Sequence, residues 1–302
     1  MSLLVCILNG LFWAFFDITR KLALKYLNPK ILLSFFMLVQ VIIFFSWTLF
    51  EKEFYFSNNY ILPGIILIVI SVISAIFFLK SILHSDLSLT IPLLSLTPIF
   101  SSLFSLVFLN EKLLFSQYFG IVSIVFGTLI LYTNELNLNS FFRSFTIIIE
   151  NKGARLMILV SIFWSITPVI DKICLEYTPI NYHGLIQSTG MLLALVSISF
   201  KEIKTIKVPF KSTGLILITL LIGTTATILQ FYSILDNYVP IMESIKRTIG
   251  QVCAVIFGYI IFKEKINIQK IIGVFILSIG VFYIFWLYNK KKCFLWNFYL
   301  LY

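Results

Sequence analysis

Four charged or amide side chains interrupt an apolar stretch, residues 239–262, that is long enough to cross a membrane: Glu243, Lys246, Arg247 and Gln251. Charges inside hydrocarbon are energetically expensive, so such side chains are expected to face protein or a water-filled cavity. With the period of an α-helix, Glu243, Arg247 and Gln251 share one face, and Lys246 lies at its edge. The stretch therefore predicts a membrane-spanning helix with one polar, charged face.

The chemistry of this face is that of anion binding. Glu243 can pair with Lys246 or Arg247 at helical spacing, but it cannot neutralise both. One positive charge is left over, and a guanidinium suits bidentate binding of a carboxylate or phosphate. We therefore predict that Arg247 binds an anionic or zwitterionic substrate, with Lys246, Glu243 and Gln251 beside it. A structural ion cluster, or long side chains that reach the nearer membrane surface, is the alternative.

The rest of the chain has the composition of a polytopic helical membrane protein. Its 302 residues are 60% hydrophobic and 12% charged, and the mean hydropathy is +1.01. A soluble domain could not cover so much apolar surface. We expect ten spans, each close to the about 20 residues that a crossing requires. They cover residues 2–26, 30–50, 60–83, 88–109, 115–133, 154–176, 180–200, 213–236, 239–262 and 266–288.

Short sequence blocks recur in the two halves of the chain at a nearly constant separation. Phe12-Trp13 matches Phe163-Trp164, Ser81-Ile82-Leu83 matches Ser233-Ile234-Leu235, and Asn110-Glu111-Lys112 matches Lys263-Glu264-Lys265. Five spans per half is an odd number, so the second half enters the membrane inverted. Inverted repeats are typical of secondary transporters, whose halves rock about a central site. The predicted fold class is an all-α polytopic membrane protein with ten transmembrane helices arranged as a 5+5 inverted repeat.

This repeat divides the chain into four parts. A first five-helix repeat covers residues 1–133, a connecting loop covers 134–153, and the second, inverted repeat covers 154–288. The remaining residues, 289–302, form a basic and aromatic tail that is too short to span the membrane. We expect that tail to lie at the membrane interface.

The repeat also indicates further binding residues. The fourth span carries an uncharged counterpart of the polar stripe that includes Thr97 and Ser101, which predicts a hydroxyl-lined wall or, alternatively, tight helix packing. Trp13 and Trp164 lie deeper than an interfacial belt, so they either stack on a substrate or pack in the core. Lys80, in the third span, reaches either the cavity or the membrane surface.

The first and sixth spans form a second constellation. Their apolar runs are shorter than a full crossing, and they end at Asp17, Arg20 and Lys21 in one half and at Asp171 and Lys172 in the other. Unusually short hydrophobic segments at matching positions of two halves point to a binding site. Ordinary interfacial helix ends, whose basic groups reach lipid phosphates, are the alternative. Asp17, Asp171 and Glu243 are the acids best placed for a proton relay.

Metal, redox and enzyme chemistry are not indicated. The four cysteines are scattered, and the two histidines, His84 and His183, stand near predicted helix ends where solvated positions are expected. No nucleophile elbow, phosphate-binding loop or zinc-protease motif is present in the sequence. We therefore expect no cofactor, no metal and no enzymatic activity. The formal net charge of +10 is explained by basic loops beside anionic lipid, so we expect no nucleic acid.

Two stretches of the chain resemble a known family of membrane proteins. Residues 89–131 and 239–284 look like the paired repeats of the drug/metabolite transporter (DMT) superfamily, EamA type. The marks are the Glu-Lys at the turn of each half and the glycines at 120, 127, 273 and 280. The resemblance implies ten spans and a central cavity lined by spans 1, 3, 4, 6, 8 and 9. It also likens the Lys246-Arg247 pair to the pair with which phosphate-sugar and nucleotide-sugar translocators hold phosphate.

The sequence thus predicts a secondary transporter of a small organic metabolite that works by alternating access, with an amino acid or an organophosphate-like anion favoured. We expect it to span the lipid bilayer of the cell membrane, the inner membrane in a bacterium, and to use a coupling proton or an exchanged metabolite. A membrane scaffold that binds partner helices, or an ion channel, is the alternative. A transporter should have an open central cavity, whereas a scaffold should have a closed core. Loop lysines and arginines predict termini outside, whereas the resemblance implies termini in the cytoplasm.

Overall fold

The computed structural model describes residues 2–51, 54–84, 91–132, 150–203, 210–263 and 268–299, and this part of the chain is helical with no strand. The predicted all-α class with ten helices is confirmed. The α-helices are α1 (Ser2–Ala23), α2 (Pro29–Phe50), α3 (Ile61–His84), α5 (Thr97–Leu109), α6 (Phe115–Tyr132), α8 (Lys152–Leu175), α9 (Ile180–Ile203), α10 (Phe210–Asp236), α11 (Val239–Phe262) and α12 (Ile268–Tyr299). Two 3-10 segments, η1 (Asn58–Tyr60) and η2 (Ile91–Leu96), precede α3 and α5.

The outer surface of the bundle is apolar. Large hydrophobic side chains such as Phe50 and Phe115 are 85% and 89% exposed. Within the described residues, six helices are each long and apolar enough to cross a membrane, by length and composition: α1, α2, α3, α8, α10 and α11. An apolar exterior of this extent suits a lipid environment, because soluble monomers rarely expose large contiguous apolar patches.

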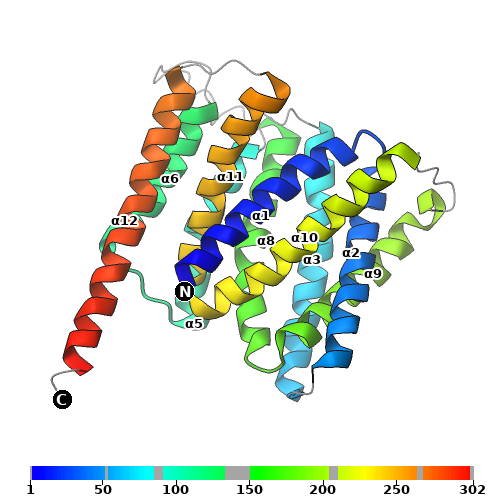
Figure 1. The fold of residues 1–302 in the computed structure, drawn as a ribbon, viewed down its shortest axis with the longest axis horizontal. Helices are drawn as coiled ribbons and strands as arrows, with labels where there is room; N and C mark the ends of the chain where they lie inside the picture. Colours follow the sequence, from blue (N-terminus) through cyan, green and yellow to red (C-terminus); the bar gives the residue numbers. More distant parts are fainter. Residues whose placement is uncertain are drawn as a thin grey trace.

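The helices of one half pack mainly against helices of the other half. The first helix of each half contacts the third helix of the other, so α1 packs on α10 and α3 packs on α8. The second helices, α2 and α9, pair with each other at one edge of the bundle, and the fifth helices, α6 and α12, pair at the opposite edge (Figure 1). Exchanging the two halves leaves this pattern unchanged, as a 5+5 inverted repeat requires.

Glycines bring α6 and α12 into backbone contact. A Cβ atom at Gly120 would lie 2.6 Å from the carbonyl oxygen of Gly280, and one at Gly280 would lie 2.7 Å from that of Gly120. A Cβ atom at Gly127 would lie 3.0 Å from the carbonyl oxygen of Gly273. These are the four glycines that the repeat places at matching positions. They act as small residues that let two membrane helices approach closely.

The turn that follows the fourth helix has the same geometry in both halves. Asn110 and Lys263 both adopt a left-handed conformation, with φ of 53°, and their N–H groups bond to the carbonyls of Ser105 and Gly258. A left-handed residue that caps a helix satisfies the last carbonyls and turns the chain sharply. The Glu of the Glu-Lys motif follows directly, so this cap determines the position of Glu111.

Two helices differ from their predicted bounds. The fourth span, predicted as one helix over 88–109, begins as the 3-10 segment η2 and becomes α-helical only at Thr97. Pro92 and Pro98 account for this, because a proline has no N–H to donate and fits best in the first turn of an α-helix, where that N–H would have no partner. The last span was expected to end at 288, but α12 continues to Tyr299, and no proline or glycine follows Gly280 to stop it. Most of the predicted connecting loop, residues 134–149, and the end of the tail, 300–302, lie outside the described residues.

Candidate functional site

A cavity of about 390 Å³ lies between the two halves. Its walls come from α1, α2, α3, α8, α9, α10 and α11, and Leu94 of η2 is the one described residue of the predicted fourth span that lines it. Spans 1, 3, 6, 8 and 9 therefore line the cavity as the resemblance implied, and α2 and α9 line it in addition. Among the described residues, none from α5, α6 or α12 reaches it.

The cavity opens at the end of the bundle where α1 and α3 terminate. The side chains of Asp17 and Arg20 near that end are 57% and 32% exposed. Deeper along the wall, Arg247 is 18% exposed, and Glu243 behind the wall is fully buried. The exposed fraction of the charged side chains thus falls from the open end of the cavity, which we call the mouth, to the opposite end, which we call the base.

The charges of α11 form one cluster around Glu243. Its carboxylate accepts a hydrogen bond from Lys246 Nζ and forms an ion pair with Arg247 Nε at 3.8 Å. Lys246 Nζ also donates to Gln230 Oε1 of α10 at 3.1 Å. Glu243 stands behind the cavity wall, whereas Lys246 and Arg247 line it. The spacing predicted this arrangement, in which one acid is shared between two cations.

Arg247 is the less satisfied of the two cations. Within the described part of the chain, its Nε has no hydrogen-bond acceptor, and Glu243 Oε2 and Gln251 Oε1 have no donor. Its guanidinium carbon lies 5.8 Å from the ring centroid of Trp164. A guanidinium held by one long ion pair and one aromatic ring keeps donors available for a carboxylate or phosphate.

The two repeated tryptophans each cover one of these cations. Lys246 Nζ lies 5.8 Å from the ring of Trp13, which is the same distance as that between Arg247 and Trp164. Trp164 is held in place because its ring stacks on Phe78 at 5.2 Å and its Nε1 donates to Ser74 Oγ at 3.2 Å. Cation–π contacts of this kind stabilise a cation that has left bulk water.

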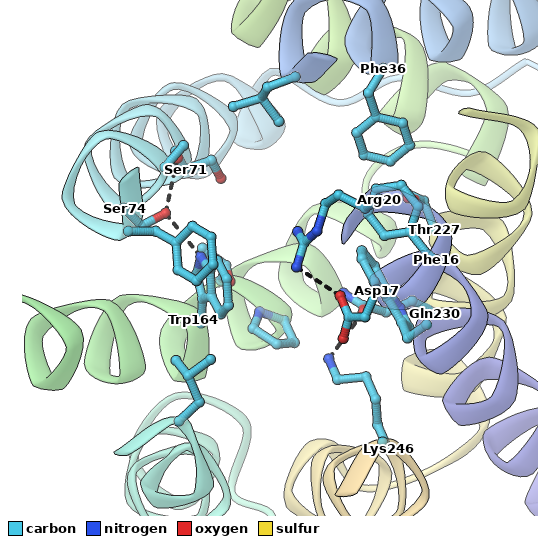
Figure 2. Close-up of a pocket in the computed structure, with 18 of the residues that line it drawn as sticks. Phe16, Asp17, Arg20, Phe36, Ser71, Ser74, Trp164, Thr227, Gln230 and Lys246 are labelled. Atoms are coloured by element: carbon cyan, nitrogen blue, oxygen red, sulfur yellow. Dashed lines mark hydrogen bonds and ion pairs between the residues drawn. The ribbon is translucent and has the colours of Figure 1, made fainter. Parts of the chain in front are cut away.

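A second ion pair stands nearer the mouth. Arg20 Nη2 lies 2.7 Å from Asp17 Oδ1, and the guanidinium packs over the rings of Phe16 and Phe78. Figure 2 shows Trp164 and Ser74 across the cavity from this pair. The short apolar run of the first span predicted a site here, and the structure places both Asp17 and Arg20 on the cavity wall.

The base of the cavity holds Asp171 of α8, which is buried. Its Oδ1 lies 3.1 Å from His183 Nε2 and accepts from Gln187 Nε2 at 3.3 Å. The expectation that His183 is solvated is wrong, because its side chain is fully buried under Phe231 and Tyr60. The location of His183 at the start of a helix does not indicate its burial, because the residues that cover it come from distant parts of the chain.

Beyond the base, a buried carboxylate ties the two halves together. Glu111 accepts from Lys172 Nζ at 2.7 Å and from the N–H of Val239, the first residue of α11, at 2.8 Å. Lys172 also donates to the carbonyl of Asn237 at 2.8 Å. The Glu-Lys turn of the first half is thereby fixed to α8 and to the start of α11 in the second half, at the end opposite the mouth.

The structure brings together five of the nine predicted site residues on the cavity wall: Arg247, Lys246, Gln251, Trp13 and Trp164. Lys80 is exposed and lies outside the cavity. Thr97 and Ser101 are buried in α5, and their hydroxyls donate to the carbonyls of Leu94 and Pro98 in their own chain segment. The hydroxyl groups on the wall come instead from Ser71, Ser74, Thr167 and Thr227.

Several wall residues escaped the sequence analysis. Gln40 of α2 donates to Thr227 of α10 at 2.8 Å, and Gln187 of α9 reaches Asp171. Gln40 is the single amide of an otherwise apolar span, which is a signal that could have indicated it, whereas Gln187 stands among other polar residues of α9.

Comparison with known proteins agrees with this architecture. The sequence profile of the EamA-like transporter family matches residues 1–133 and 151–286. The chain belongs to the EamA-like transporter family. It is thereby a member of the DMT superfamily, and its apolar helices are those of a multi-pass membrane protein.

Two individual proteins illustrate the relationship. The chain is 24% identical over 199 residues to "Uncharacterized transporter YoaV" from Bacillus subtilis (strain 168), and the alignment spans 65% of each protein. A protein of known crystal structure has the same fold, with a TM-score of 0.74 at 12% identity, over 96% of this chain and 98% of that one.

Proposed function

We propose that this protein is a secondary transporter that carries a small organic metabolite with a negatively charged group across the cell membrane. An amino acid or an organophosphate is the favoured substrate. The two five-helix halves alternate the exposure of the cavity between the two sides of the membrane. The observation that carries this proposal is the incompletely paired guanidinium of Arg247 inside a cavity that opens to one side.

The charge arrangement supports an anionic group at Arg247. Glu243 satisfies Lys246 closely and Arg247 only at 3.8 Å, so the Arg247 side of the cluster carries the surplus positive charge. A ligand carboxylate or phosphate at this point would complete the hydrogen bonding of the guanidinium in a site of low exposure. Charge-assisted hydrogen bonds of this kind are about twice as strong as neutral ones.

The size and walls of the cavity support a small metabolite. A volume of about 390 Å³ lies at the small end of ligand pockets. Trp13 and Trp164 provide flat apolar surfaces beside the two cations, which suits the carbon skeleton of an amino acid or a sugar phosphate. An open cavity of this kind also argues against the scaffold alternative, which requires a closed core.

The site can be tested with the purified protein in liposomes. Uptake of labelled amino acids, glycerol 3-phosphate and a cationic control would be compared for the wild type, Arg247→Ala and Arg247→Lys. Loss of a charge-assisted hydrogen bond costs about 1.5–3 kcal/mol, so Arg247→Ala should lower transport efficiency roughly 10- to 100-fold. Arg247→Lys should recover part of this loss, because it restores the charge without the fork.

The exposed Lys80 offers a matched control, because Lys80→Ala also removes a cation from the membrane region but outside the cavity. We expect it to transport like the wild type. Unchanged transport of every anion by folded Arg247→Ala and Arg247→Lys would remove Arg247 from the site. Transport confined to the cationic probe would overturn the anionic substrate class.

A further inference from the structure

Three buried side chains form a hydrogen-bonded chain that leads away from the base of the cavity. Asp171 lines the cavity, His183 Nε2 lies 3.1 Å from its Oδ1, and the Tyr60 hydroxyl lies 3.0 Å from His183 Nδ1. Their exposed fractions are 2%, 0% and 3%. Tyr60 precedes α3, at the end of the bundle opposite the mouth, and the adjacent Asn59 is exposed. The chain therefore connects the cavity to the closed side.

This chain can hold an added proton without rearrangement. When the imidazole is neutral and donates from Nε2 to Asp171, its Nδ1 accepts the hydroxyl proton of Tyr60. When the imidazole is protonated, both ring nitrogens donate, and the Tyr60 hydroxyl turns to accept. Each state satisfies every hydrogen bond in the chain.

The described groups around this pair come from several elements of both halves. Cys174 of α8 and Tyr60 interact electrostatically with Asp171, and so does Lys246 of α11. Phe231 of α10 covers the imidazole edge-on, with ring centroids 4.9 Å apart. From α9, Gln187 donates to Asp171. Lys246 is the one formally charged partner among these, and it stands on the cavity side.

The protonation of this pair determines the net charge of the cavity. The charged groups in and behind the wall are three cations, Arg20, Lys246 and Arg247, and three acids, Asp17, Asp171 and Glu243. Their formal charges sum to zero while Asp171 is ionised and His183 is neutral. One added proton makes the cavity positive, which favours an anion at Arg247. By reciprocity, a bound anion favours the proton.

We infer that Asp171 and His183 form the binding site of a coupling proton, and that this proton and an anionic substrate are carried in the same direction. The proton enters from water in the open cavity and binds the Asp171–His183 pair. It leaves to the other side when the halves exchange exposure and Tyr60 meets water. No bond other than those to the proton is made or broken. The inference rests on the proposed function and adds the coupling ion to the same site.

The test separates net transport from exchange. Liposomes containing the wild type, Asp171→Asn or His183→Asn would be given an inward proton gradient with labelled amino acids or glycerol 3-phosphate outside. A gradient of one pH unit should drive accumulation up to about tenfold in the wild type if one proton accompanies each monoanion. Both variants should lose this accumulation, because neither keeps the hydrogen-bonded carboxylate–imidazole pair that forms the proposed proton site.

Exchange of labelled for unlabelled substrate at equal pH requires no net proton movement. His183→Asn, whose side chain lies behind the cavity wall, should therefore retain exchange, which shows that it is folded and still binds substrate. His84→Asn is the matched control, because His84 is the other histidine of the chain and lies exposed at the end of α3. It should accumulate substrate like the wild type.

The possible failures are distinct. Wild-type transport that ignores the proton gradient, or gradient-driven accumulation that survives in Asp171→Asn and His183→Asn, would overturn the proton site while leaving the proposed function intact. Wild-type protein that neither exchanges nor accumulates any anionic or zwitterionic probe would overturn both.

Discussion

Helices α11 and α5 occupy corresponding places in the two halves, and they use their polar faces in opposite ways. The face of α11 carries Lys246 and Arg247 into the cavity. The face of α5 carries Thr97 and Ser101, whose hydroxyls bond to carbonyls of their own chain segment. The sequence pattern of small polar residues at helical spacing is shared, but it serves binding in one helix and packing in the other.

The difference has a local physical cause. α11 is one continuous helix over Val239–Phe262 with Pro240 in its first turn, so its charged residues lie within regular helix in the second and third turns. Its counterpart reaches α-helical geometry only at Thr97, after a 3-10 segment. A hydroxyl side chain can donate its hydrogen bond to a nearby backbone carbonyl, whereas a charged side chain needs an oppositely charged partner or water. Charge therefore distinguishes the two faces, and small size does not.

The strongest challenge to this comparison is removal of the acid in α11. Glu243→Ala would leave Lys246 and Arg247 without their shared carboxylate, and loss of one partner of a buried ion pair costs about 3–5 kcal/mol. We expect a correspondingly large drop in the free energy of unfolding, measured by denaturation of the purified protein in detergent. Glu243→Gln should lose less, because it keeps an acceptor for Lys246. Wild-type stability in Glu243→Ala would mean that the cluster is solvated.

A smaller effect is expected at the aromatic wall that faces α11. Trp164→Ala removes the ring beside Arg247, and a cation–π contact contributes about 0.5–2 kcal/mol, which corresponds to roughly a 2- to 30-fold loss of apparent substrate affinity. Trp164→Phe should retain most of the affinity, because it keeps an aromatic face. Concentration dependence of uptake in liposomes measures this. Equal losses in both variants would assign the effect to the hydrogen bond with Ser74 instead.

The smallest effect is expected in α5. Ser101→Ala removes a hydroxyl that bonds within its own helix, so the stability should change by less than about 1 kcal/mol and transport should stay near the wild-type rate. Thr97→Val makes the same test one turn earlier. Loss of transport in a folded Ser101→Ala protein would show that the α5 face contacts substrate when the cavity faces the other way.

The sequence alone predicted the features that depend on one helix or on the repeat. These include the ten helices and the helical spacing at which Glu243 pairs with Lys246 or Arg247, whereas for Trp13 and Trp164 it left a cavity position and core packing both open. It missed features that depend on contacts between distant segments. Gln40 meets Thr227 and His183 meets Tyr60 only after the halves have packed, and no spacing along the chain encodes these contacts.

The glycine contact between α6 and α12 bears on how the two halves came to fit. Gly120 contacts Gly280, and Gly127 contacts Gly273. Because Gly120 matches Gly273 and Gly127 matches Gly280 in the repeat, the same two repeat positions contact each other in both pairs. This reciprocity is the mark of an isologous dimer interface, in which one surface is complementary to itself. A single five-helix unit inserted in both orientations could form the same contact with its own copy. Fusing two such units into one chain then frees each half to change separately, and the cations of α11 are a change that only one half carries.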